Sequence, residues 1–133
     1  MPTRYQQLRQ AIARLGANAD EQDAYLEGIL GHLTPDGGAS GYGNDELALE
    51  FEDIYMAVGD MLHWGEISQK EIDAAKPLNE MLSKWSGQQN ADFWQRDALR
   101  SDQRWEQVRQ CSRQVLLAYP DEERASDWMN GEN

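Results

Sequence analysis

Apolar residues recur at steps of three and four along most of this chain of 133 residues. Steps of that size place side chains on one face of a helix, and no segment shows the sustained alternation that predicts a half-buried strand. The clearest predicted helix spans residues 44–64, where the shared apolar face consists of Leu47, Phe51, Ile54, Val58 and Leu62. The pattern predicts an all-α fold, with a single compact, bundle-like domain of about six helices.

Capping residues and chain breakers mark the ends of the helices on either side of this segment. Thr3 is placed to cap a first helix that ends at Leu15, and a second helix is expected to begin at Asp20. Residues 34–43 contain one proline and four glycines, which predicts a loop.

The C-terminal half of the chain begins with a capping box, in which Ser68 and Glu71 start a helix. Pro77 is expected to kink or divide that helix. A short helix is expected over residues 92–99, and Ser101 is expected to cap the last long helix.

We expect the helical domain to occupy residues 1–120 and the polar, acidic residues 121–133 to form a loose tail. No run approaches the roughly 20 apolar residues that span a bilayer, and residues 1–14 lack the apolar stretch of a signal peptide, so a cytoplasmic protein is predicted. Cys111 is the only cysteine, which excludes an internal disulfide and a cysteine metal cluster.

Acidic residues are concentrated in one part of the sequence. The net charge of the chain is −12, and residues 20–69 contain twelve acidic residues but no lysine or arginine. These carboxylates have no basic neighbour in the sequence, and such self-repulsion costs stability unless something compensates for it. The charge disfavours nucleic acid and anionic membranes as partners and favours a basic protein surface.

The sequence shows no recognisable catalytic constellation. A di-iron carboxylate bundle needs two Glu-x-x-His motifs, and the nearest match is the single pair of Asp60 and His63. A G-x-S-x-G elbow is absent, and no histidine lies near Cys111 in the sequence. We therefore expect a protein that is not an enzyme and holds no cofactor; a metal-dependent helical hydrolase or oxidase using His63, Asp60 and nearby Glu residues remains an alternative.

The acidic side chains of the predicted helix over 44–64 are the best candidates for a binding surface. Glu46, Glu50, Asp53 and Asp60 form one stripe beside its apolar face, without lysine or arginine partners four residues away. The second predicted helix adds acids of the same sign, and nearby aromatic residues suit an interface. The complete set of predicted partner-binding residues is Glu21, Asp23, Glu27, Tyr42, Asp45, Glu46, Glu50, Asp53, Tyr55, Asp60 and Trp64.

Residues 45–119 also resemble a known family. The phrases DELALEFEDIYMAVGDML, ISQKEIDAAKPLNEMLSKWSG and NADFWQRDALRSDQRWEQVRQCSRQVLLAY are similar to small helical immunity proteins of bacterial contact-dependent growth inhibition and related polymorphic-toxin systems. The resemblance implies a bacterial cytoplasmic protein that neutralises the C-terminal domain of a cognate toxin, often a nuclease. It carries no family binding residues across to this chain.

Resemblance and charge lead to the same expectation. An acidic helical face complements the lysines and arginines with which a nuclease grips phosphates, so we expect a monomer that binds a basic toxin domain. An acidic nucleic-acid mimic that occupies a host DNA-binding or RNA-binding protein is the alternative binding function.

Overall fold

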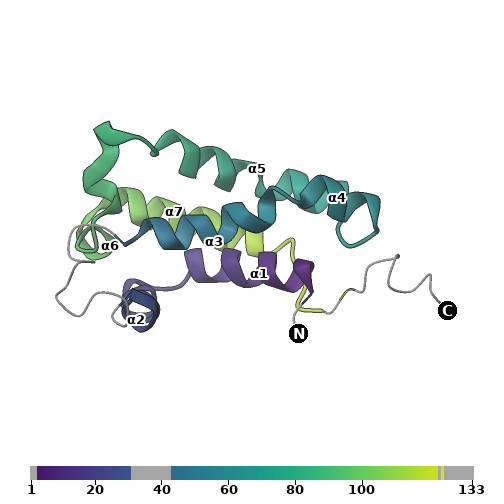
Figure 1. Ribbon diagram of the computed structural model, residues 1–133, viewed down its shortest axis with the longest axis horizontal. Coiled ribbons are helices and arrows are strands. Elements are labelled where there is room, and N and C mark those ends of the chain that lie inside the picture. Colours follow the sequence, from purple (N-terminus) through teal and green to yellow (C-terminus); the bar gives the residue numbers. More distant parts are fainter. Residues whose placement is uncertain (1–2, 31–42, 123, 125–133) are drawn as a thin grey trace.

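The computed structural model describes residues 3–30, 43–122 and 124. Within these ranges the chain forms seven α-helices and one 3-10 helix, which confirms the predicted all-α fold (Figure 1). The elements, in chain order, are α1 (Arg4–Leu15), α2 (Ala19–Leu30), α3 (Asp45–Tyr55), α4 (Val58–His63), α5 (Gln69–Lys84), η2 (Gln88–Trp94), α6 (Ala98–Ser101) and α7 (Gln103–Leu116).

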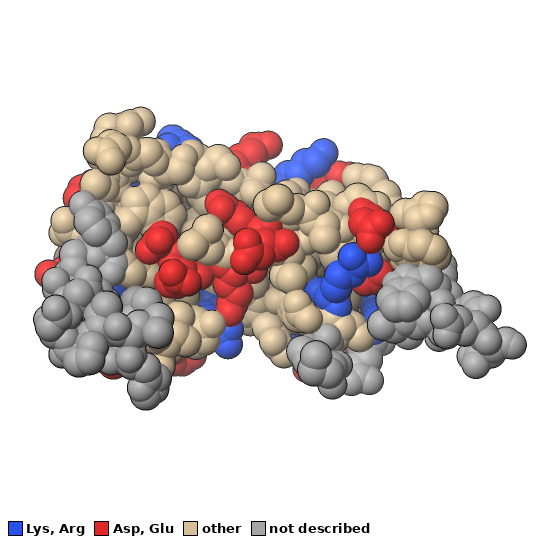
Figure 2. Space-filling view, in the orientation of Figure 1, with Lys and Arg blue, Asp and Glu red and all other residues tan. Residues whose placement is uncertain are grey.

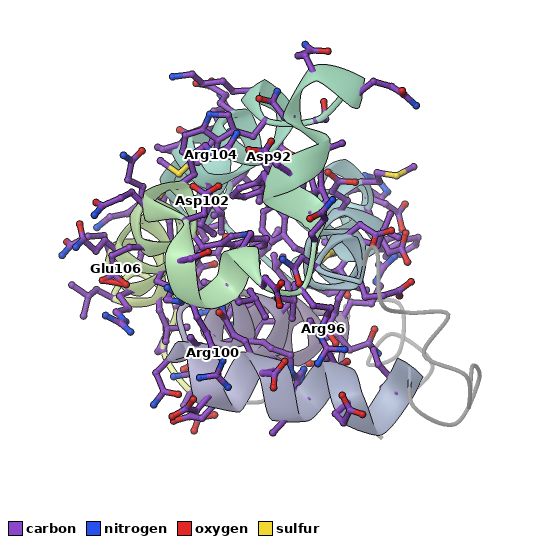
Figure 3. The ribbon with its side chains drawn as sticks, turned by 90° about the vertical axis from the view of Figure 1, so that its left-hand side faces the viewer. Asp92, Arg96, Arg100, Asp102, Arg104 and Glu106 are labelled. Atoms are coloured by element: carbon purple, nitrogen blue, oxygen red, sulfur yellow. The ribbon has the colours of Figure 1, made fainter. Side chains whose placement is uncertain are left out.

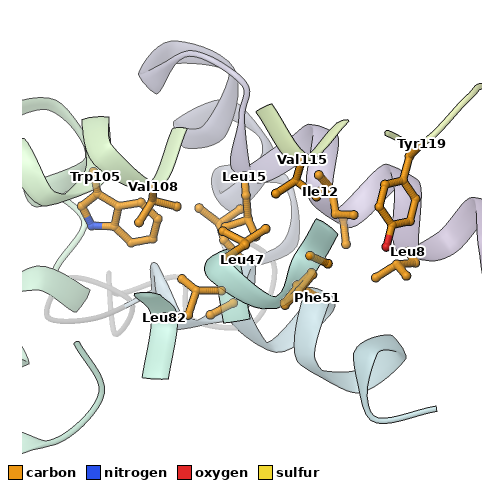
Figure 4. Packing of buried hydrophobic residues seen from close by; sticks show 14 of the residues in the cluster. Leu8, Ile12, Leu15, Leu47, Phe51, Leu82, Trp105, Val108, Val115 and Tyr119 are labelled. Carbon is orange, nitrogen blue, oxygen red and sulfur yellow. The ribbon is translucent and has the colours of Figure 1, made fainter. Parts of the chain in front are cut away.

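The core lies where α1, α3, α5 and α7 pack together. Helix α1 packs against both α3 and α7, α5 packs against α7, and α2 packs against α6. The close view in Figure 4 shows how the inward faces meet. The fully buried side chains there include Leu8, Ile12, Leu15, Phe51, Leu78, Trp105 and Val108. Burying one such apolar side chain stabilises the fold by about 1.5–3 kcal/mol.

The predicted helix over 44–64 is two helices, because the hydrogen-bond ladder tightens after α3. The Ala57 N–H donates to the Ile54 carbonyl at 2.9 Å, a step of three residues instead of four. Helix α4 then begins at Val58. Met61 is fully buried, whereas Leu62, predicted to face inward, is 38% exposed.

Three further boundaries differ from the prediction. Helix α5 is not divided at Pro77, which lies on the exposed side of the helix. The predicted helix over 92–99 is replaced by η2 and the short α6. The cap of α7 is Asp102, whose carboxylate accepts a hydrogen bond from the Arg104 N–H at 2.9 Å; Ser101 is instead the last residue of α6.

The capping predictions at Thr3 and Ser68 are confirmed, since each residue heads a reciprocal capping box. Arg124, in the predicted tail, binds the Glu71 carboxylate with both terminal nitrogens at 2.6 and 2.8 Å. Its guanidinium also lies 3.9 Å from the centre of the Tyr5 ring. Residues 123 and 125–133 lie outside the described residues. None of the described helices combines the length and the apolar character needed to cross a membrane.

Candidate functional site

The acids of α2 lie beside arginines that come from much later in the chain. Arg96 contacts the Asp23 carboxylate at 2.5 Å and the Glu27 carboxylate at 3.2 Å. Arg100 binds Asp20 and also approaches Asp23 at 3.5 Å. Figure 3 looks at this end of the molecule, where Arg96 and Arg100 point toward α2. We call these five residues the α2 ion-pair cluster.

The α2 ion-pair cluster changes the titration of its most central acid. Hydrogen bonds from Arg96, with a smaller contribution from Arg100, hold the pKa of Asp23 below its usual value. Arg96 also donates to the Asp23 backbone carbonyl at 3.3 Å, so it ties η2 and α6 to α2. Glu21, the remaining predicted acid of α2, is exposed and accepts a hydrogen bond from the Asn18 side chain at 2.9 Å.

Arginines of α1 neutralise acids on α3 and α4 in the same way. Arg14 reaches Glu50 at 3.0 Å, and the same carboxylate accepts a hydrogen bond from the Tyr25 hydroxyl at 2.7 Å. Arg4 contacts Asp60 at 3.0 Å and also binds Glu66. Glu66 is buried, so this ion pair is part of the interior.

Arginines distant in the sequence therefore compensate for much of the acidic block, which has no basic neighbours within it. The sequence argument considered partners four residues away, whereas Arg4 and Glu66 are 62 residues apart in the chain. Tertiary folding brings the basic N-terminal segment and the later arginines to the acids. Asp23, Glu27, Glu50 and Asp60 are thus engaged in internal ion pairs.

Four acids of α3 have a different environment. Asp45, Glu46, Glu52 and Asp53 form no ion pair within the described part of the chain. Together with the exposed Leu49 and Met56 they make up what we call the α3 face. Figure 2 shows acidic side chains gathered over α3 in the middle of this side of the molecule.

The position of each acid along α3 decides whether the helix itself stabilises it. Asp45 and Glu46 lie in the first turn, where the helix dipole favours negative charge. Glu52 and Asp53 lie in the last turn, where the dipole opposes it, and no basic residue lies in that turn. Burial, together with the neighbouring charge of Asp53, raises the pKa of Glu52. The fold therefore tolerates two adjacent carboxylates at a place where they are unfavourable.

A groove runs along α3 on the side that faces the end of α5 and η2. Its volume is about 530 Å³, and we call it the α3 groove. Its residues are Asp45, Ala48, Leu49, Glu52, Leu82, Ser86, Gly87, Gln88, Ala91 and Trp94. Carboxylates thus flank apolar side chains in one open site.

Buried hydrogen bonds fix the two walls of this groove relative to each other. The backbone N–H groups of Gly43 and Asn44 both donate to the Trp94 carbonyl at 3.3 Å. The buried Asn44 side chain donates to the carbonyls of Phe93 at 3.3 Å and Gln95 at 2.5 Å. The start of α3 is therefore fastened to the end of η2.

The predicted aromatic candidates do not join the α3 groove. Tyr42 lies outside the described residues. Tyr55 stacks on Phe51 with ring centres 5.1 Å apart, at the edge of the core. Trp64 makes an edge-on contact with the ring of His63, with centres 4.9 Å apart.

The metal site considered from the sequence is not assembled among the residues that the structure describes. The Asp60 carboxylate is occupied by Arg4. In the described ranges, no three or more His, Cys, Asp or Glu side chains converge in a way that could hold a metal ion.

Sequence reasoning missed Leu49, Met56, Glu52 and Trp94. Leu49 is 41% exposed and Met56 is 84% exposed, although both are large apolar residues. Helical spacing does contain a signal, because Asp45, Leu49, Glu52 and Met56 follow one another at steps of four and three on the outward side of α3. Trp94 carried no such signal, since its place beside α3 arises only from tertiary packing.

Comparison with known proteins identifies no relative of this chain. No protein-family model matches the chain, and neither the curated proteins nor the solved structures contain a match.

Proposed function

We propose that this chain is an immunity protein that binds a bacterial toxin domain with a basic surface and neutralises it through the α3 face. The observation that carries the proposal is the adjacent pair of Glu52 and Asp53, which lack ion pairs in the described chain and lie in the unfavourable last turn of α3. Residues that reduce the stability of a fold are expected where function requires them.

Apolar side chains on the same face support a protein partner. Leu49 and Met56 lie exposed between and beside the acids, and exposed apolar residues rimmed by polar ones mark interaction surfaces. Carboxylates alone mainly change the association rate and its salt dependence, whereas a buried apolar anchor supplies affinity. The α3 face offers both. A basic nuclease cleft, which must hold phosphates, would meet it with complementary charge.

The nucleic-acid mimic is the less favoured binding function. A mimic needs carboxylates at phosphate spacing along an extended surface, whereas four acids without ion pairs in the described chain lie together on one helix of 11 residues. The acids of the α2 ion-pair cluster are already matched by Arg96 and Arg100. This charge pattern thus fits a compact basic patch on a protein better than the elongated binding surface of a nucleic-acid-binding protein.

Co-expression with a candidate toxin domain from a neighbouring gene tests the proposal. We expect cells that produce the domain to survive only when the chain is present, and the purified proteins to form a complex. Survival without the chain, or a lack of both protection and complex formation, would overturn the immunity function.

A matched pair of variants tests the surface. Glu52→Gln/Asp53→Asn removes two negative charges from the α3 face, and Gln107→Lys/Gln110→Lys adds two positive charges on exposed positions of α7. Both variants change the net charge by the same amount, so a long-range effect would slow association equally in both. We expect the α3 variant to associate several-fold more slowly at low salt and the α7 variant to stay within about twofold of the unchanged chain.

A further inference from the structure

The chain repeatedly uses one arrangement to hold an arginine: a carboxylate together with an aromatic ring. Arg104 contacts Asp92 at 2.9 Å and Asp102 at 2.6 Å, and its guanidinium carbon lies 5.2 Å from the centre of the Phe93 ring. Figure 3 shows Arg104 beside these two carboxylates.

Two other arginines repeat this arrangement. Arg14 lies 3.8 Å from the centre of the Tyr25 ring and pairs with Glu50. Arg124 lies 3.9 Å from the centre of the Tyr5 ring and pairs with Glu71. A guanidinium suits such sites because it is planar, stacks on aromatic faces and binds carboxylates through a fork of donors.

The α3 groove contains the same components without an arginine of the chain's own. Trp94, the aromatic type that binds cations best, lines the groove together with Asp45 and Glu52. No lysine or arginine is among the described residues that line it. Ala48, Leu49 and Leu82 add apolar surface between the polar ends.

The aromatic wall is held in place before any partner binds. The Trp94 indole N–H donates to the Trp85 carbonyl at 3.0 Å. Its ring makes edge-on contacts with the rings of Phe93 and Trp105, with centres 4.7 and 5.9 Å apart. A preformed wall lowers the entropic cost of binding.

From these observations we infer that the α3 groove binds an arginine of the protein partner, presented next to an apolar side chain. The guanidinium lies against Trp94 and pairs with the groove carboxylates, while the apolar neighbour contacts Leu49 and Leu82. This inference rests on the proposed function for the identity of the partner but not for the chemistry of the site. Lysine fits less well, because its compact ammonium cannot stack flat on an aromatic ring or donate two parallel hydrogen bonds to one carboxylate.

Short peptides and the full chain test the groove directly. The probe is acetyl-Leu-Arg-Leu-amide, and its matched control carries citrulline, which has nearly the same shape without the charge. NMR titration would follow the Trp94 indole N–H and the Leu49 methyl groups. We expect saturable shifts with the arginine peptide, weaker binding when lysine replaces arginine, and no saturation with citrulline.

Variants of the chain supply the second arm. Glu52→Gln should raise the dissociation constant of the arginine peptide by roughly three- to fivefold, as loss of one partly exposed ion pair predicts. Gln107→Lys/Gln110→Lys should leave it within twofold. Equal binding of the citrulline peptide, or shifts centred on α2 or α7, would overturn the inference.

Failure of the groove and failure of the immunity function give different results. If the arginine peptide binds the groove but the chain does not protect cells, the arginine-binding inference is supported and the immunity function is rejected. If the chain protects cells and Leu49→Ala/Glu52→Gln leaves both protection and complex affinity unchanged, the groove is not the partner site.

Discussion

Helices α2 and α3 both carry acids on their outward sides, but they differ in how many of these acids form ion pairs with arginines elsewhere in the chain. Arg96 and Arg100 reach Asp20, Asp23 and Glu27 of α2 and tie that helix to η2 and α6. On α3, Asp45, Glu46, Glu52 and Asp53 form no ion pair among the described residues, and two of them lie at the unfavourable end of the helix. Acids of the first kind support the fold, whereas acids of the second kind are available to a partner.

A count of charges in the sequence cannot separate acids that are paired within the fold from acids that are not. Residues 20–69 contain acids of both kinds within the same uniform block. What distinguishes them is whether an arginine from a distant part of the chain folds onto them.

The largest effect is expected from removing the cation of a buried ion pair. Arg4→Ala would leave the Glu66 carboxylate, whose side chain is 4% exposed, without its partner. Because an uncompensated buried charge is strongly unfavourable, we expect a loss of about 3 kcal/mol in the free energy of unfolding, measured in urea. The double variant Arg4→Ala/Glu66→Gln should recover at least 1 kcal/mol or so. No loss in the single variant would mean that the acid is not structurally paired.

An intermediate effect is expected from the link between α3 and η2. Asn44→Ala would leave the Gln95 carbonyl without its side-chain donor, while the Phe93 carbonyl would keep the indole N–H of Trp105. We expect a cost of about 2 kcal/mol in unfolding free energy and weaker binding of the arginine peptide, since the groove walls lose their connection. Asn44→Asp should be more harmful, because it sets carboxylate oxygens against the two carbonyls. A neutral outcome for both variants would contradict the proposed role of Asn44.

The smallest stability effect should have the opposite sign. Glu52→Gln removes a charge that the dipole of α3 and Asp53 both disfavour. We expect a gain of about 0.5 kcal/mol at pH 7, in contrast to the loss for a matched acid. Destabilisation by this variant at pH 7 would show that Glu52 has an internal stabilising role.

The pH dependence of unfolding separates the two kinds of acid. The folded pKa of Asp23 is lowered, so its contribution is present above the ordinary value of 3.8 and is lost as the pH falls through the folded pKa. The folded pKa of Glu52 is raised, so its contribution to stability declines as the pH rises from the ordinary value of 4.5 through the folded pKa. Unfolding of Asp23→Asn and Glu52→Gln in urea between pH 3 and pH 7 checks both signs. Parallel pH profiles would contradict the distinction.

Local chemistry made much of the fold predictable from the sequence. Thr3 and Ser68 act through partners three residues away, and the inward residues of α1 repeat at helical spacing. No helix-breaking or capping residue marks the boundary between α3 and α4 in the sequence, because Met56 and Ala57 are both compatible with a continuing helix. The ladder changes there only through a tightened bond between Ala57 and Ile54.

The candidate site was less predictable, for a physical reason. Asp45, Glu46 and Asp53 were expected from the sequence and lie on the α3 face. Whether a neighbouring acid is neutralised depends on contacts across long separations, such as the 36 residues between Arg14 and Glu50. The groove also needs Trp94, which only packing brings beside α3.

Association rates with the proposed toxin partner test whether the α3 face is the partner surface. The comparison needs the unchanged chain, Glu52→Gln/Asp53→Asn on α3 and Asp20→Asn/Glu27→Gln on α2, each measured over a series of salt concentrations. Both variants remove two negative charges, so they change the net charge of the chain equally, but the α2 acids are ion-paired within the described chain and the α3 acids are not. We predict that the α3 variant associates several-fold more slowly at low salt with a flatter salt dependence, while the α2 variant stays within about twofold of the unchanged chain. Equal slowing by both variants, or slowing by the α2 variant alone, would contradict the assignment of the α3 face as the partner surface.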